Sequence, residues 1–192
     1  MGTIVISENV SLDGVVQDPT GQEGSRHGGW FDEFGGNDLE AWGKVAFQEA
    51  LRAEALLFGR RSYEYFAARW PSRPGEWADR LRDLPKYVVS STPLTGPDWK
   101  NSTVISGDVV SEISKLKQQL DGEIVVYASR QLVRTLINHD LVDELRLTVF
   151  PVVLGGGDRL FDEISEKTPL RLLDAGTIGE DLAFVNYEVV RR

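Results

Sequence analysis

The 192-residue sequence contains no cysteine and only two histidines, His27 and His139. Without cysteine the chain has no disulfide, no thiol nucleophile and no thiolate metal site, and two histidines are too few for a histidine-rich metal centre. The segment Met1 to Ile6 lacks the basic and long apolar regions of a signal peptide, and no apolar run approaches the ~20 residues of a membrane span. We expect a soluble, cytoplasmic protein without a metal site.

Positive charge is also scarce, because 21 Lys and Arg face 30 Asp and Glu and leave a net charge of -9. Such a surface repels the phosphate backbone of nucleic acids and anionic lipid headgroups. We therefore expect neither nucleic acid nor membrane as a partner. The 41% hydrophobic content supports a packed core, and no linker, repeat or low-complexity stretch divides the chain. A single domain over residues 1–192 is predicted.

The order of apolar patterns predicts strands that alternate with helices over the first two thirds of the chain. Predicted strands are 3–10, 55–58, 86–91, 103–105 and 124–127; predicted helices begin near residues 39, 60, 76, 109 and 132. Alternating apolar residues around 145–149 and 185–189 predict partly antiparallel strands at the end. Six glycines between Gly21 and Gly36 favour an irregular aromatic lid. The fold class is α/β, with a mixed, mostly parallel sheet flanked by helices.

Three strand-to-helix junctions could bind an anion, since ligands of open α/β sheets lie beyond the carboxyl ends of strands, at helix N-termini. They are Gly59-Arg60-Arg61-Ser62, Ser90-Ser91-Thr92 and Tyr127-Ala128-Ser129-Arg130-Gln131. Each also has an ordinary explanation: solvated arginines, a serine-rich turn and a helix cap. Together the three favour a dinucleotide, which is long enough to need several loops at once.

Gly155-Gly156-Gly157 fits either a flexible turn or a ligand that approaches the backbone closely. No Lys-Ser or Lys-Thr follows it, as a Walker motif requires, and the chain has no Gly-x-Gly-x-x-Gly run that opens a helix.

Several segments resemble a known family in the order in which they occur. Leu57 to Glu64 resembles the Gly-Arg-x-Thr/Ser-aromatic motif of dihydrofolate-reductase-like proteins, and Val89 to Pro93 resembles their adenosine-side strand end. Leu141 to Leu147 and Pro151 to Phe161 are similar to the C-terminal reductase domain of the bifunctional riboflavin-biosynthesis deaminase-reductase and its stand-alone relatives. With Ser11-Leu12-Asp13-Gly14 the resemblance spans nearly the whole chain. It implies a three-layer α/β/α fold.

The resemblance also implies an oxidoreductase that uses NADPH, with Arg60 and Arg61 facing the 2′-phosphate beside Ser90 and Ser91. Ser129, Arg130 and Gln131 would meet the pyrophosphate; relatives commonly carry Gly where this chain has Ala128. The remaining candidate cofactor contacts are Gly59, Ser62, Thr92, Tyr127, Gly155 and Gly156. The zinc deaminase half cannot be present, because its zinc needs Cys.

The substrate side is less specific. Asp13, Asp32 and Asp38 are candidates to orient a substrate or relay a proton, although loop carboxylates are mostly solvated and Asp38 could be only a helix-start charge. Flat side chains could stack on a planar substrate, and Trp70 before Pro71 could equally belong to the core. The candidate stacking residues are Trp30, Phe31, Tyr63 and Tyr65.

The leading hypothesis is an NADPH-dependent reductase of a small heteroaromatic or ribosylamino-pyrimidine substrate, similar to 5-amino-6-(5-phosphoribosylamino)uracil reductase of riboflavin biosynthesis. The alternative is a non-catalytic dinucleotide- or flavin-binding protein on the same fold, and a third is a purely structural dimerisation module. The strand-rich C-terminal third could supply an edge for a homodimer.

Overall fold

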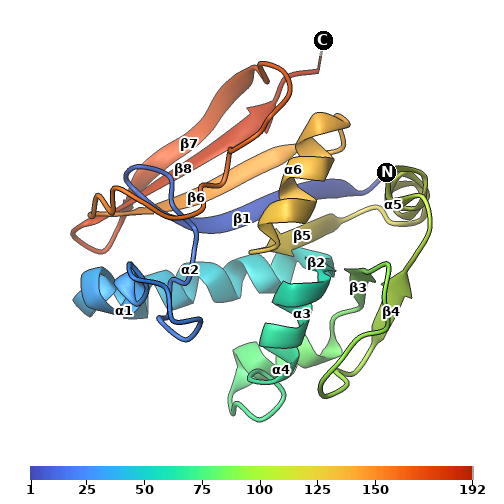
Figure 1. Cartoon of the computed structure of the whole chain (residues 1–192), viewed down its shortest axis with the longest axis horizontal. Coiled ribbons are helices and arrows are strands. Elements are labelled where there is room, and N and C mark those ends of the chain that lie inside the picture. The colour runs from blue at the N-terminus through green and yellow to red at the C-terminus, as the bar shows by residue number, and fades with distance from the viewer. Residues whose placement is uncertain (192) are drawn as a thin grey trace.

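The computed structural model describes residues 1–191. Its strands form one eight-stranded sheet in the order β4-β3-β2-β5-β1-β6-β8-β7 (Figure 1). The strands are β1 (Thr3–Ser11), β2 (Ala53–Gly59), β3 (Lys86–Val89), β4 (Ser102–Ile105), β5 (Glu123–Tyr127), β6 (Glu144–Phe150), β7 (Leu170–Ile178) and β8 (Leu182–Val189). The helices are α1 (Trp30–Gly35), the 3-10 helix η1 (Gly36–Asp38), α2 (Leu39–Arg52), α3 (Arg60–Ala67), α4 (Glu76–Asp83), α5 (Val109–Gln119) and α6 (Arg130–Asn138).

Strands β1 to β6 pair in parallel, whereas β8 runs antiparallel to β6 and β7 antiparallel to β8. This is the predicted α/β fold with a mixed, mostly parallel sheet and antiparallel C-terminal strands. Because the parallel strands β3, β2 and β5 are neighbours, their carboxyl ends lie at one edge of the sheet.

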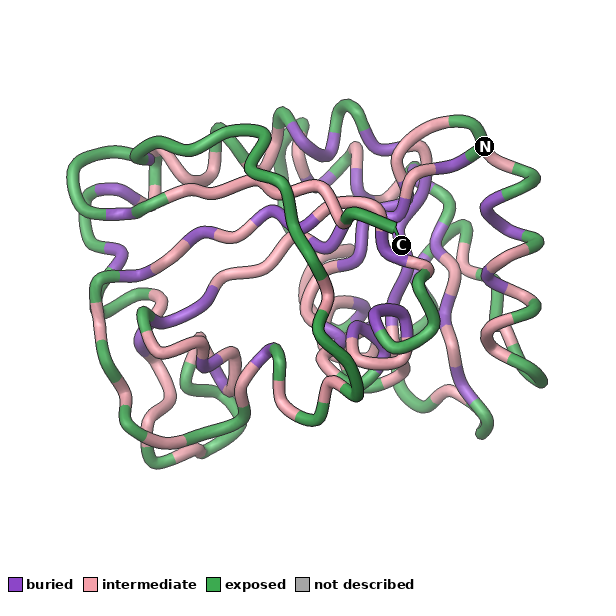
Figure 2. The backbone as a smooth tube through the Cα atoms, turned by 90° about the horizontal axis from the view of Figure 1, so that it is seen from above, coloured by how far each residue is buried: buried purple, intermediate pink, exposed green. Residues whose placement is uncertain are grey.

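Helices cover both faces of the sheet. On one face, α5 and α6 pack on alternate residues of the central strands, such as Ile4 and Ile6 of β1. On the other, α2, α3 and α4 pack on the intervening residues, such as Val5 and Val125. Successive side chains of a strand point to opposite faces of the sheet, which separates the residues that contact the two groups of helices. Along the helices, buried and exposed residues recur within successive turns (Figure 2), as expected for elements with one face on a sheet.

Two parts of the fold differ from the sequence-based expectation. The glycine-rich segment is not wholly irregular, since α1 and η1 form within it; the ring of Trp30 stacks edge-to-face on Phe150 at 5.3 Å and buries the helix on the sheet. The sequence pattern does not locate strand β7 individually. All of its residues are exposed except the last one, Ile178, so the strand lacks the alternation of buried and exposed residues that would reveal it in the sequence.

Within residues 1–191, no helix combines the length and apolar character that crossing a membrane requires. The same residues contain no group of three or more His, Asp or Glu side chains placed to hold a metal ion.

Candidate functional site

A pocket of about 1130 Å³ opens at the carboxyl ends of β2, β3 and β5. All three junctions predicted from the sequence contribute to its wall. The predicted cofactor residues that line it are Gly59, Arg60, Arg61, Ser62, Ser90, Ser91, Thr92, Tyr127, Ala128, Ser129, Arg130 and Gln131. We call the part of the pocket lined by these residues, other than Tyr127, the outer half. The structure thus brings the junctions together, while their role in binding a cofactor stays a prediction.

Hydrogen bonds fasten two of the junctions to each other. The Gly59 N–H donates to Ser129 Oγ at 3.0 Å, and the Ser129 N–H donates to Ser62 Oγ at 2.8 Å. Ala128 and Ser129 both have left-handed backbone conformations, with φ of 49° and 60°. Glycine adopts this conformation without strain, so Ala128 stands at a position that favours Gly.

The first turns of α3 and α6 are suited to an anion. Neither helix has a side-chain cap, and neither has an acidic residue in its first turn. Their leading amide groups have no intrahelical acceptor, and the helix dipole adds partial positive charge. Two helices of this kind on adjacent strands fit the two phosphates of a pyrophosphate.

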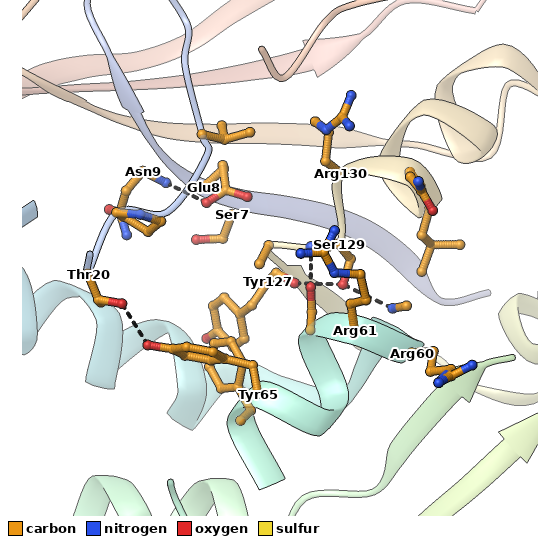
Figure 3. A pocket seen from close by; sticks show the side chains of 18 of the residues that line it. Ser7, Glu8, Asn9, Thr20, Arg60, Arg61, Tyr65, Tyr127, Ser129 and Arg130 are labelled. Atoms are coloured by element: carbon orange, nitrogen blue, oxygen red, sulfur yellow. Dashed lines mark hydrogen bonds between the residues drawn. The ribbon is translucent and has the colours of Figure 1, made fainter. Parts of the chain in front are cut away.

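Three arginines surround the outer half (Figure 3). Arg60 donates to Thr92 Oγ1 at 2.5 Å and to Glu64 Oε1 at 3.1 Å, which holds its guanidinium beside the end of β3. Arg61 is exposed and 3.4 Å from Glu23 Oε1, and Arg130 pairs with an Asp158 oxygen at 2.9 Å. Exposed pairs of this kind contribute little to stability, so these cations can exchange their partners for a ligand at low cost.

The pocket continues between the sheet and α2, and we call this part the inner chamber. Its wall is rich in flat side chains: Phe31, Trp42, Tyr65, Phe66, Trp70, Trp77, Tyr127 and Phe184. Polar groups of the sheet line it as well, because Ser7 pairs with both Tyr127 and Arg146 in the strand register and Asn9 pairs with Thr148. An aromatic chamber with a few polar groups is typical of a site for a small ring.

Arg146 is buried beneath the inner chamber and is surrounded by carboxylates. Its Nη1 is 2.8 Å from Glu123 Oε2 and 3.2 Å from Glu49 Oε2, and its Nη2 donates to Glu123 Oε1 and Glu144 Oε2, both at 2.9 Å. The carboxylates raise the pKa of Arg146 although burial opposes this, and the bond to Arg146 lowers the pKa of Glu123. Both terminal nitrogens of this guanidinium therefore donate to carboxylates of the protein itself.

Two polar atoms of the chamber wall lack a partner in the described part of the chain. They are the Tyr127 hydroxyl oxygen and Trp77 Nε1, and both are buried. Burial raises the pKa of Tyr127 well above its ordinary value, and both the negative charge of Glu49 and a hydrogen-bonding interaction with its carboxylate add to this. Buried polar groups are nearly always hydrogen-bonded, so the Trp77 N–H and the acceptor side of the Tyr127 oxygen are available to a ligand.

Glu8, which sequence reasoning missed, also lines the pocket. In Figure 3 it lies on β1 with Ser7 and Asn9, between Thr20 on one side and Arg130 on the other. Burial raises its pKa from 4.5 to about 8, although the Asn9 N–H donates to it at 3.0 Å and lowers the value. A signal was present, because Glu8 interrupts the apolar series of Ile4, Ile6 and Val10 on one face of the strand.

The predicted substrate residues divide into two groups. Phe31 and Tyr65 line the pocket, and the Tyr65 hydroxyl and Thr20 Oγ1 are 2.8 Å apart, which joins the loop after β1 to α3. The structure corrects the other two. Trp30 is 1% exposed against Phe150, and Tyr63 is 2% exposed, with its hydroxyl bonded to Ser102. Both belong to the core, because their positions on α1 and α3 face the sheet.

Of the predicted catalytic carboxylates, only Asp32 lines the pocket. Asp13 lies apart from its lining and accepts the N–H groups of Leu154 and Gly155; its bond from Ser11 is the main reason that its pKa falls to about 2. Asp38 accepts the N–H groups of Glu180 and Asp181, which lowers its pKa. Both carboxylates hold turns together.

Two of the three glycines predicted at the cofactor, Gly155 and Gly156, lie elsewhere, whereas Gly59 lines the pocket. The Gly155 N–H donates to Asp13, so Gly155 belongs to the turn that this carboxylate stabilises. Gly156 lies beside the His27 ring: a Cβ atom added to Gly156 would be 3.4 Å from His27 Nε2. Neither lines the pocket. The triple glycine therefore belongs to a turn in the segment that follows β6.

Comparison with known proteins places this architecture in a family. The sequence pattern of the RibD C-terminal domain matches residues 2–184. The Bacillus subtilis (strain 168) protein YwjB is 30% identical over 171 residues, which cover 89% of each chain. The protein YyaP of the same organism is 29% identical over 139 residues, or 70% of this chain and 73% of YyaP. Both relatives are named as uncharacterized proteins.

Solved structures show the same fold. A putative riboflavin biosynthesis protein from Shewanella sp. PV-4 superposes with a TM-score of 0.76 at 22% identity, covering 98% of this chain and 99% of that one. Dihydrofolate reductase from Enterococcus faecalis, complexed with NADP(H), gives 0.61 at 16% identity, covering 98% and 97%. RibD from Acinetobacter baumannii gives 0.67 at 15% identity, with all of this chain covering 59% of that one. The chain belongs to the RibD C-terminal domain family, and its fold is that of dihydrofolate reductase.

Proposed function

We propose that this protein is an NADPH-dependent reductase of a small heteroaromatic or ribosylamino-pyrimidine substrate, similar to 5-amino-6-(5-phosphoribosylamino)uracil reductase. One observation carries the proposal: a pocket with cations and free helix N-termini in its outer half continues into an aromatic inner chamber. A dinucleotide needs the first part, and a planar substrate needs the second. The Enterococcus faecalis reductase of the same fold, which was complexed with NADP(H), supports this choice of cofactor.

The residues of the outer half fit the cofactor chemically. Arg60, held by Thr92 beside Ser90 and Ser91, would bind the 2′-phosphate, because a guanidinium offers paired donors to phosphate oxygens. The first turns of α3 and α6 would bind the pyrophosphate. When bound, the cofactor supplies the hydride.

A reduction of a C=N bond by hydride also needs a proton at the nitrogen, and we propose Glu8 as its source. The carboxyl group lines the pocket, and a pKa of about 8 keeps it protonated at neutral pH. A general acid is most effective when its pKa lies near the working pH. After the transfer, proton uptake from water would restore the protonated form of Glu8.

Titration with NADPH and NADH, followed by fluorescence, tests the cofactor assignment. The change Arg60→Ala should weaken NADPH binding by about tenfold or more and leave NADH binding nearly unchanged, since only NADPH carries the 2′-phosphate. Arg171→Ala is the control, because Arg171 is an exposed arginine of β7 paired with Glu188 and lies outside the pocket lining. Equal losses for the two cofactors would remove the role assigned to Arg60.

Oxidation of NADPH in the presence of pyrimidine and pterin substrates tests the reaction. The change Glu8→Gln should lower turnover by about a hundredfold or more with little change in NADPH affinity. Turnover of the unchanged protein should fall as the pH rises through about 8, the pKa of Glu8. Cofactor binding without turnover of any ring would favour the non-catalytic alternative.

A further inference from the structure

We infer that the inner chamber accepts uncharged or cationic aromatic rings with N–H donors and excludes rings that carry a phosphate or carboxylate inside it. The inference rests on the proposed function in treating this chamber as the substrate half of the pocket. It narrows the substrate class, because it separates amino-substituted rings from anionic ones.

The charges around Arg146 supply the first step. One guanidinium serves three carboxylates, those of Glu49, Glu123 and Glu144. A second cation, Arg52, lies 3.9 Å from Glu123 and is more than half exposed. The group therefore keeps a surplus of negative charge where water is largely excluded, and there charge acts over longer distances than in bulk water. An anion in the chamber would be repelled.

The free hydrogen-bonding capacity of the chamber supplies the second step. The carboxylate of Glu49 lines the pocket, where it accepts a bond from Arg146 and interacts with the Tyr127 hydroxyl. Its two oxygens can accept more bonds than these, so acceptor sites stay open. The Tyr127 hydroxyl interacts with Glu49, and its oxygen accepts no hydrogen bond from residues 1–191. A ring with an amino group or a protonated ring nitrogen would satisfy these acceptors, and Trp77 Nε1 would donate to an acceptor atom on the same ring.

The cations that remain lie toward the solvent. Arg73 stacks its guanidinium 4.5 Å above the Trp70 ring and is exposed. Asp32 lines the same pocket and is exposed too. An anionic substituent on a long tail could reach Arg73 at the surface, whereas one attached directly to the ring would enter the acidic chamber.

Three pyrimidines of similar size separate these cases: 2,4-diaminopyrimidine, which is rich in donors; uracil, which is neutral; and orotate, which is uracil with a carboxylate. Calorimetric titration of the whole protein, saturated with NADP⁺, should give affinities that fall in this order. We expect about tenfold or more between the first and the last, as for one charge-assisted hydrogen bond. Tighter or equal binding of orotate, or binding of no ring, would overturn the inference.

The change Glu49→Gln removes the charge and keeps the size, so it should reduce the ratio between 2,4-diaminopyrimidine and orotate several-fold. Glu40→Gln is the control on the same helix, since Glu40 is exposed and paired with Lys44; there the ratio should stay as it was. An unchanged ratio in Glu49→Gln would overturn the inference. If that variant fails to fold, Tyr127→Phe decides: weaker 2,4-diaminopyrimidine binding supports the inference, and unchanged binding overturns it.

A separate NADPH titration on the same protein distinguishes the two proposals. If NADPH binds and the rings rank in the opposite order, only the inference on the chamber fails. If the rings rank as expected and NADPH does not bind, the proposed function fails while the chemistry of the chamber stands.

Discussion

The change Glu8→Gln should stabilise the protein, and by an amount that grows with pH. Burial raises the pKa of Glu8 from 4.5 to about 8 in the folded chain. Between these values the folded chain holds a proton that the unfolded chain has released. The free energy of unfolding therefore falls as the pH rises through this window, and it is level below and above it. Glutamine has no proton to lose and removes this dependence.

The size of the effect follows from the two pKa values. At about 1.4 kcal/mol per unit, the full difference corresponds to roughly 5 kcal/mol. Water in the pocket screens the charge of a half-buried carboxylate, so we expect about 2 kcal/mol between the bottom and the top of the window.

Urea unfolding at about pH 5, 7 and 9 measures the difference between Glu8→Gln and the unchanged protein. The stabilisation should be small at the lowest pH and largest at the highest. Glu40→Gln is the control, because Lys44 lowers the pKa of Glu40. Removing this carboxylate should lower the free energy of unfolding, whereas Glu8→Gln should raise it. A stabilisation by Glu8→Gln that does not change with pH would refute the reasoning, since it would show that Glu8 is ionised in the folded chain.

Three further changes test other parts of the structure. Arg146→Met should cost about 3 to 5 kcal/mol of stability in urea unfolding, because it leaves three carboxylates without their buried cation; a loss below 1 kcal/mol would contradict the burial of the cluster. Ala128→Gly should add about 0.5 to 1 kcal/mol, because Ala128 has φ of 49°; destabilisation would contradict the strain. We also propose a homodimer through β7, whose Leu170, Leu172 and Leu173 are exposed, so Leu172→Lys should yield monomers in light scattering; a monomeric unchanged protein would refute this.

The outer half of the pocket could be predicted because each of its parts is local in the sequence. A buried strand, a small residue and a helix start follow one another at Phe58 to Ser62 and again at Tyr127 to Gln131. Parallel strands then bring their carboxyl ends to one edge without further information. The strands β2, β3 and β5 are sheet neighbours, so the junctions meet.

The inner chamber could not be predicted in the same way, because its residues come together through the order of the strands. Tyr127, Ser7 and Arg146 are far apart in the sequence and adjacent only because β5, β1 and β6 are neighbours. The same reason explains the misplaced carboxylates. Asp13 and Asp38 each accept N–H groups of residues more than 140 positions later in the chain, and no local pattern announces such partners.

The distribution of charge in the pocket gives the proposed cofactor one direction of binding. The chain as a whole has a net charge of -9, yet Arg60, Arg61 and Arg130 gather around the outer half. The inner chamber has the opposite character, with the surplus of carboxylates around Arg146. The phosphates of a dinucleotide must therefore stay at the outer half, and only an end without phosphate can extend toward the chamber. The nicotinamide is such an end, so the electrostatics that bind the cofactor would also bring its reactive ring to the substrate.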